Sequence, residues 1–194
     1  MLQTTEEAGS RRALVLLAPG AEEMEVVIIV DVLRRGGVEV VLAGIQGAGP
    51  VGCSRAVTLV PDVALSSCVR TDEAWDLLVL PGGAPGTDAL AASEVVGEVL
   101  RQQCAAGRLV GAICAAPLAL ARHGVFAGVP MTSHPSVSQE VASHGVWTSG
   151  RVVEADGLIT SMGPGTAFAF ALTLVAKLRG AAVAEALRAP MILD

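Results

Sequence analysis

Aromatic residues are scarce in this chain of 194 residues, which contains three Phe, two Trp and no Tyr. Proteins that bind single-stranded nucleic acid stack the bases on aromatic side chains, so this composition argues against such a function. The formal net charge is −6, and Lys and Arg form no cluster larger than a pair. Because nucleic-acid binders display a basic face, nucleic acid is not expected as the main partner.

The sequence also lacks paired cysteines and long apolar runs. Its four cysteines, Cys53, Cys68, Cys104 and Cys114, are widely spaced and include no C-x-x-C motif. This spacing is typical neither of a zinc site nor of a secreted disulfide framework, so we expect reduced thiols in the cytoplasm and no bound metal. No stretch reaches the roughly 20 apolar residues that span a bilayer, so no membrane span is expected.

Short strand-like runs alternate with helical ones after a polar N-terminal tail, which we assign to residues 1–11. The remainder, residues 12–194, has the size of a single α/β domain. Strands are predicted at Ala13–Ala18, Val38–Ala43, Val57–Val60, Asp76–Leu80, Arg108–Ile113, Met131–Ser133, Val152–Glu154 and Leu158–Ser161. Helices are predicted at Glu22–Arg35, Ser93–Ala106, Ala115–His123, Thr166–Arg179 and Ala182–Arg188. This alternation predicts βαβ units and a mostly parallel sheet between two helical layers, with ligands at the carboxyl ends of the strands.

Cys114 stands alone between a predicted strand and a predicted helix. Its neighbours two positions away, Ala112 and Ala116, are small, as a strained strand-to-helix turn requires around a nucleophile. Pro117 suits the start of the following helix. The start of a helix also favours a thiolate, so the sequence predicts a lowered pKa for a reactive Cys114. A buried, inert cysteine on an alanine-rich element is the alternative.

Glu25 is the second candidate. It lies in the acidic first turn of a predicted helix, where a partner for the helix dipole is the simpler explanation. If Glu25 instead points toward Cys114, its pKa should rise, because a carboxylate and a thiolate close together repel one another. A protonated Glu25 could then donate a hydrogen bond to the sulfur.

His134 follows a predicted strand and is the histidine best placed to exchange protons with Cys114. Backbone N–H groups of Gly82 and Gly83, after another strand, and of Ala115 could hold an oxyanion. The histidines at 123 and 144 each precede a glycine and are better explained as partners of helix C-termini.

Five segments in this order, GAEEMEVVI, VLPGG, GAICAAP, TSHP and GLITSMGPGT, resemble the animal deglycases of the ThiJ/PfpI superfamily. The resemblance extends from Arg12 to the C-terminus. It implies a flavodoxin-like three-layer sandwich, a homodimer and a cofactor-independent protein of the cytoplasm, nucleus and mitochondrion.

By this resemblance Cys114 is the reactive cysteine, which oxidises to a sulfinate, and Glu25 is its carboxylic-acid partner. His134 matches the pocket histidine, and Cys53 is a second redox-sensitive thiol. The resemblance further assigns backbone amides to Gly82, Gly83 and Ala115, and an anion-binding patch to Arg35 and Arg55. Val60 and Met162 depart from the family pattern, which has cysteine and arginine at these positions.

The leading hypothesis is a glyoxalase or protein deglycase that acts on methylglyoxal-type α-oxoaldehydes or their early adducts on glycated proteins. The alternative is a non-enzymatic redox sensor and chaperone. An amidotransferase or cysteine peptidase is a third option, but no histidine follows His144 to serve glutamine hydrolysis.

Overall fold

The computed structural model describes residues 10–69 and 74–193, so most of the predicted tail, residues 1–9, lies outside the described residues. Within the described ranges the main sheet has seven strands in the order β10-β11-β7-β6-β1-β2-β5. These strands are β1 (Arg12–Leu17), β2 (Glu39–Gly44), β5 (Val63–Ala64), β6 (Leu77–Leu80), β7 (Leu109–Ile113), β10 (Val152–Ala155) and β11 (Leu158–Ser161). All neighbours pair in parallel except β10 with β11, which confirms the predicted, mostly parallel sheet.

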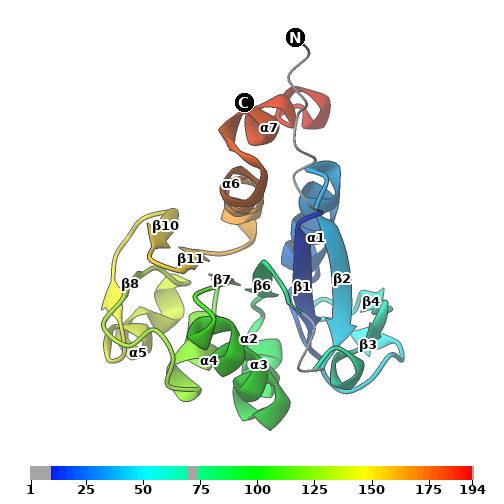
Figure 1. The fold of residues 1–194 in the computed structure, drawn as a ribbon. Helices are drawn as coiled ribbons and strands as arrows, with labels where there is room; N and C mark the ends of the chain where they lie inside the picture. The colour runs from blue at the N-terminus through cyan, green and yellow to red at the C-terminus, as the bar shows by residue number, and fades with distance from the viewer. Residues whose placement is uncertain (1–9, 70–73, 194) are drawn as a thin grey trace.

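Helices cover both faces of the sheet (Figure 1). They are α1 (Glu23–Arg35), α2 (Ala84–Ala92), α3 (Glu94–Ala105), α4 (Pro117–Arg122), α5 (Ser138–Ala142), α6 (Ala167–Arg179) and α7 (Ala181–Ala186). One apolar core joins the sheet to α1, α6 and α7, and a second joins it to α2, α3 and α4. The three-layer sandwich predicted from the sequence is therefore confirmed.

Strand β1 shows how the sequence produces these two layers. Ala13, Val15 and Leu17 belong to the core under α1 and α6, whereas Leu14 and Leu16 belong to the core on the opposite face. Side chains alternate between the faces of a strand, so a continuous apolar run buries both faces, as parallel sheets require.

Two predicted strands lie outside the main sheet. The segment Val57–Val60 forms β4 (Thr58–Leu59), which pairs antiparallel with β3 (Val51–Gly52) in a small hairpin. The segment Met131–Ser133 contributes β8 (Pro130–Met131), which pairs in parallel with β9 (Val146–Trp147). Apolar character alone predicted these strands, and it does not determine which edge a short strand joins.

Helix α2 was not predicted. Its first residues, Ala84-Pro85-Gly86, resemble a turn, but proline is favoured in the first turn of a helix, and Gly83 enters the helix at φ +87°. None of the helices in residues 10–69 and 74–193 is both long enough and apolar enough to cross a membrane.

Candidate active site

Three loops meet where adjacent parallel strands end. Strands β7, β6 and β1 are neighbours in the sheet, so the segments that follow them converge at one edge, as expected for this class of fold. They border a cavity of about 350 Å³. Its lining residues are Glu22, Ser54, Arg55, Gly83, Ala84, Pro85, Cys114, Ala115, His134, Ser136, Val137 and Pro164.

Cys114 occupies a strained turn directly after β7. Its φ of +65° is in the left-handed region, which is unfavourable for a residue with a Cβ. Two hydrogen bonds fix the turn: the Cys114 N–H donates to the Ser161 carbonyl at 2.9 Å, and the Cys114 carbonyl accepts from the His134 N–H at 2.8 Å. Ala112 and Ala116 are fully buried on either side. The geometry is that of a nucleophile presented on a tight strand-to-helix turn.

Glu25 is fully buried in the first turns of α1. Its Oε2 accepts a hydrogen bond of 2.7 Å from the Gly82 N–H, and the carboxyl group also interacts with the Cys114 thiol. Its other oxygen, Oε1, is buried without a hydrogen-bond partner of good geometry among the described residues. A protonated Glu25 that donates to the sulfur would satisfy this oxygen.

Burial raises the pKa of Glu25 to about 7, although the Gly82 N–H acts to lower it. Burial, and then the negative charge of Glu25, raise the pKa of Cys114 to about 12, against the lowering effect of the Gly83 and Ala115 N–H groups. Both raised pKa values disfavour the state in which Glu25 and Cys114 are negatively charged at the same time. The pair therefore shares a single proton over a wide pH range.

The predicted rise in the pKa of Glu25 is confirmed, but the lowered pKa expected for Cys114 is wrong for the thiol considered alone. Helix α4 begins only at Pro117 and has six residues, so its dipole is short and set back from the sulfur. Burial therefore raises the pKa of Cys114 by more than the dipole of α4 lowers it. An ionised sulfur exists near neutrality only in the state in which Glu25 keeps the shared proton.

Gly82 allows the two groups to approach. A Cβ at this position would lie 2.5 Å from the Cys114 Cβ, 2.8 Å from the Ile113 carbonyl oxygen and 2.9 Å from the Glu25 Oε2. No side chain fits in that space. The predicted backbone donors at Gly83 and Ala115 do face Cys114, whereas Gly82 donates to Glu25 instead.

His134 lies beside the sulfur at the rim of the cavity. A Cβ added at Gly163 would stand 3.6 Å from the His134 Cδ2 and 3.9 Å from the Cys114 Sγ, so one position contacts both groups. The Nδ1 of His134 accepts from the Ser136 N–H at 3.2 Å. Neutral His134 therefore carries its proton on Nε2, where it can donate to a bound oxygen.

The two arginines of the predicted anion patch are not brought together within one copy of the chain. Arg55 lines the cavity, and its loop is fastened to α1 because the Glu23 carboxylate accepts from the Arg55 N–H at 2.9 Å. Arg35 lies in the last turn of α1, at the opposite end of the helix from Glu25, and pairs with Asp31 at 2.6 Å. Within one copy of the chain the two arginines therefore form no common patch, and an anion-binding role for Arg35 stays a prediction.

Cys53 does not line the cavity. It is 9% exposed, and burial together with the charge of Glu23 raises its pKa. Sequence reasoning missed Ser54, which lies in a turn, and Ser136, which lies in the 3-10 helix Pro135–Val137; neither belongs to a motif with a recognisable spacing. Only their contacts reveal them: Ser54 Oγ donates to Glu22 at 2.8 Å, and Ser136 bonds to His134.

Comparison with known proteins places this site in a family. The model of the DJ-1/PfpI family matches residues 11–177. Protein dj-1beta of Drosophila melanogaster is 48% identical over 88% of this chain and 91% of its own. The Parkinson disease protein 7 homolog of Danio rerio is 46% identical, covering 94% and 97% of the two chains. The glutathione-independent glyoxalase DJR-1.2 of Caenorhabditis elegans is 42% identical, covering 96% and 98%.

The fold agrees as well. The crystal structure of Drosophila melanogaster DJ-1beta superposes with a TM-score of 0.92 at 44% identity, covering 95% of this chain and 99% of that one. The resemblance to the ThiJ/PfpI superfamily seen in the sequence motifs is confirmed. This chain belongs to the DJ-1/PfpI family.

Proposed function

We propose that this protein is a cofactor-independent glyoxalase and protein deglycase that converts methylglyoxal-type α-oxoaldehydes, or their early protein adducts, into 2-hydroxy acids. One observation carries the proposal: a fully buried carboxyl group interacts with a thiol on a strained turn beside a cavity of about 350 Å³. The similarity to a named glyoxalase supports the same reaction class.

In the first step the Cys114 sulfur attacks the aldehyde carbon and forms a C–S bond. The shared proton stays on Glu25, whose pKa of about 7 suits a group that gives and accepts protons at neutral pH. The N–H groups of Gly83 and Ala115, which face the sulfur, stabilise the oxyanion of the resulting hemithioacetal. His134 donates from Nε2 to the second oxygen of the substrate.

In the second step the oxyanion takes the shared proton from Glu25, which leaves a Glu25 carboxylate. This carboxylate removes the proton from the former aldehyde carbon and returns a proton to the neighbouring carbon, while the hydroxyl proton moves to the neighbouring oxygen. The former aldehyde carbon is thereby oxidised to a thioester while the neighbouring carbon is reduced to an alcohol, so no external oxidant is required. One water then hydrolyses the thioester, releasing a 2-hydroxy acid and restoring the Cys114 thiol. For a protein adduct the bond between the former aldehyde carbon and the side-chain sulfur or nitrogen breaks, the leaving atom takes a proton, and the same single water is consumed.

The proposal is tested by following methylglyoxal turnover and lactate formation with purified protein. Cys114→Ser should abolish turnover because the alcohol cannot replace the thiolate as nucleophile. Cys104→Ser is the matched control, since Cys104 lies on α3 and lines none of the Cys114 cavity. Equal rates for Cys114→Ser and the unaltered protein would refute the proposal.

A second candidate function is redox sensing coupled to a chaperone activity, and the exposure of Cys114 to a cavity favours it. A sulfinate at Cys114 would accept hydrogen bonds from the same N–H groups and from protonated Glu25. Cys53 is buried and does not line this cavity. Mass spectrometry after mild peroxide treatment should therefore find oxygen on Cys114 first; earlier oxidation of Cys53 or Cys104 would remove the basis for sensing.

We further propose a homodimer of the cytoplasm, and also of the nucleus and mitochondrion. Apolar side chains on α1 and the β3–β4 hairpin support the dimer: Val27 is 51% exposed and Val60 63%, and both line one cavity. Exposed apolar clusters of this kind are typical of protein interfaces. Sedimentation should give the mass of two chains, and Val27→Glu should shift it to one.

A further inference from the structure

A second cavity, of about 450 Å³, lies next to the Cys114 cavity. The same three segments line both. Helix α2 contributes its first turn to the Cys114 cavity and its later turns to the second; the segment from Cys114 through α4 and the segment from His134 through α5 do likewise. The residues of the second cavity, which we call the α2–α4–α5 groove, are Thr87, Asp88, Ala91, Leu118, Ala121, Arg122, Glu140 and Ser143.

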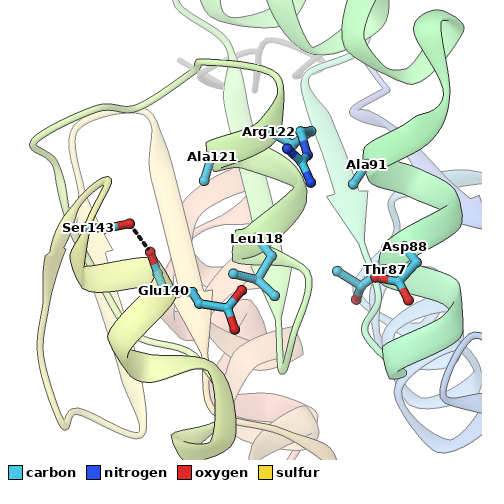
Figure 2. A pocket seen from close by; sticks show the side chains of 8 residues that line it. All are labelled: Thr87, Asp88, Ala91, Leu118, Ala121, Arg122, Glu140 and Ser143. Atoms are coloured by element: carbon cyan, nitrogen blue, oxygen red, sulfur yellow. Dashed lines mark hydrogen bonds between the residues drawn. The ribbon is translucent and has the colours of Figure 1, made fainter.

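The groove presents charged groups of both signs. Figure 2 shows Asp88 of α2 and Glu140 of α5 on opposite sides, with Leu118 of α4 between them and Arg122 toward one end. All three charged side chains are exposed. Among the described residues none of them makes an ion pair or a side-chain hydrogen bond, and the bond from Ser143 reaches only the Glu140 backbone carbonyl.

Thr87 supplies an independent sign of a ligand. Its side chain extends from α2 toward the groove (Figure 2), and the residue is only 2% exposed. Its Oγ1 is buried and has no hydrogen-bond partner within the part of the chain that the structure describes. Buried hydroxyl groups are almost always hydrogen-bonded, so this one is poised for a polar group that enters the groove.

We propose that the α2–α4–α5 groove binds the polypeptide that flanks a modified side chain while the adduct occupies the Cys114 cavity, an inference that rests on the proposed deglycase function. A basic side chain would lie between Asp88 and Glu140, with its aliphatic stem on Leu118. Peptide carbonyl groups would accept hydrogen bonds from Arg122 and Thr87. The groove thereby selects protein-linked adducts that have a Lys or Arg nearby.

The length of α2 sets the spacing. Pro85 borders the Cys114 cavity and Asp88 the groove. Three residues of helix rise about 4.5 Å, which an extended peptide spans with one or two residues. We therefore expect the preferred basic residue one or two positions from the modified one.

The test uses blocked peptides with a central cysteine alkylated to S-acetonylcysteine, a stable thioether that cannot release free methylglyoxal. One set has Lys two positions before or after this residue, and the other has Glu there. Calorimetry at low salt should show that a Lys peptide binds about tenfold more tightly than its Glu counterpart. The double variant Asp88→Asn/Glu140→Gln should lose this preference.

The matched control is Glu154→Gln/Asp156→Asn, which removes the same charge at the β10–β11 turn and should retain the preference. Turnover of free methylglyoxal should be the same in all these variants. A Lys preference absent from the unaltered protein, or retained in the Asp88/Glu140 variant, overturns the groove proposal. Absence of methylglyoxal turnover in the unaltered protein refutes the enzymatic function instead, and the peptide affinities still decide whether the groove binds.

Discussion

Replacing Gly82 with alanine tests the central geometric claim, that the thiol and the carboxyl group meet because nothing stands between them. The new Cβ would lie 2.5 Å from the Cys114 Cβ and 2.9 Å from the Glu25 Oε2. Apolar carbon atoms pack at about 3.5–4.0 Å, so either the Cys114 turn or the β6–α2 loop must move by about 1 Å.

The structure sets the size of the effect. Overpacking of this kind costs about 1–3 kcal/mol, and the displaced hydrogen bond from the Gly82 N–H to the buried carboxyl group adds about 1.5–3 kcal/mol. The combined loss of about 2.5–6 kcal/mol should lower Tm by about 5–20 °C in a chain of this length. A displacement near 1 Å should also reduce kcat/KM about 100-fold.

Thermal unfolding and methylglyoxal turnover measure these two effects. Gly165→Ala is the control, because a Cβ there meets no atom within 4 Å. If Gly82→Ala matched Gly165→Ala in both Tm and kcat/KM, the close approach of Cys114 and Glu25 would not be what the glycine provides.

Two further predictions concern the same site. Folding raises the pKa of Glu25 from 4.5 to about 7, so its contribution to stability is complete below pH 4.5 and is lost as the pH rises through 7. The free energy of unfolding of the unaltered protein should therefore fall by about 2 kcal/mol between pH 5 and 7.5. Glu25→Gln cannot ionise, so its free energy of unfolding should fall much less over the same pH range. Gly163→Ala places a methyl group at ordinary contact distances from His134 and Cys114. It should therefore leave Tm unchanged and raise KM for methylglyoxal, because the methyl group narrows the cavity. A lowered Tm with a normal KM would contradict this geometry.

The sequence predicts the architecture of this protein well because its signals are local. The uninterrupted apolar run of β1 and the acidic first turn and basic last turn of α1 each favour one kind of element, and the structure places these elements as expected. Helix α2 escapes prediction because its opening Ala-Pro-Gly is equally typical of a turn. The pairing of β4 with β3 could not be predicted because pairing of a two-residue strand depends on tertiary contacts.

For the site, too, some features could be predicted from the sequence and others could not. The small residues around Cys114 mark a tight turn in any context, so its position could be predicted from the sequence. The protonation of the pair could not, because it depends on how much water the folded chain removes from around the sulfur. That difference bears on mechanism: a thiolate created by a helix dipole would survive removal of Glu25, whereas a thiolate that exists only while Glu25 holds the shared proton should not. In the proposed mechanism, the protonation state of Glu25 therefore decides when Cys114 can react.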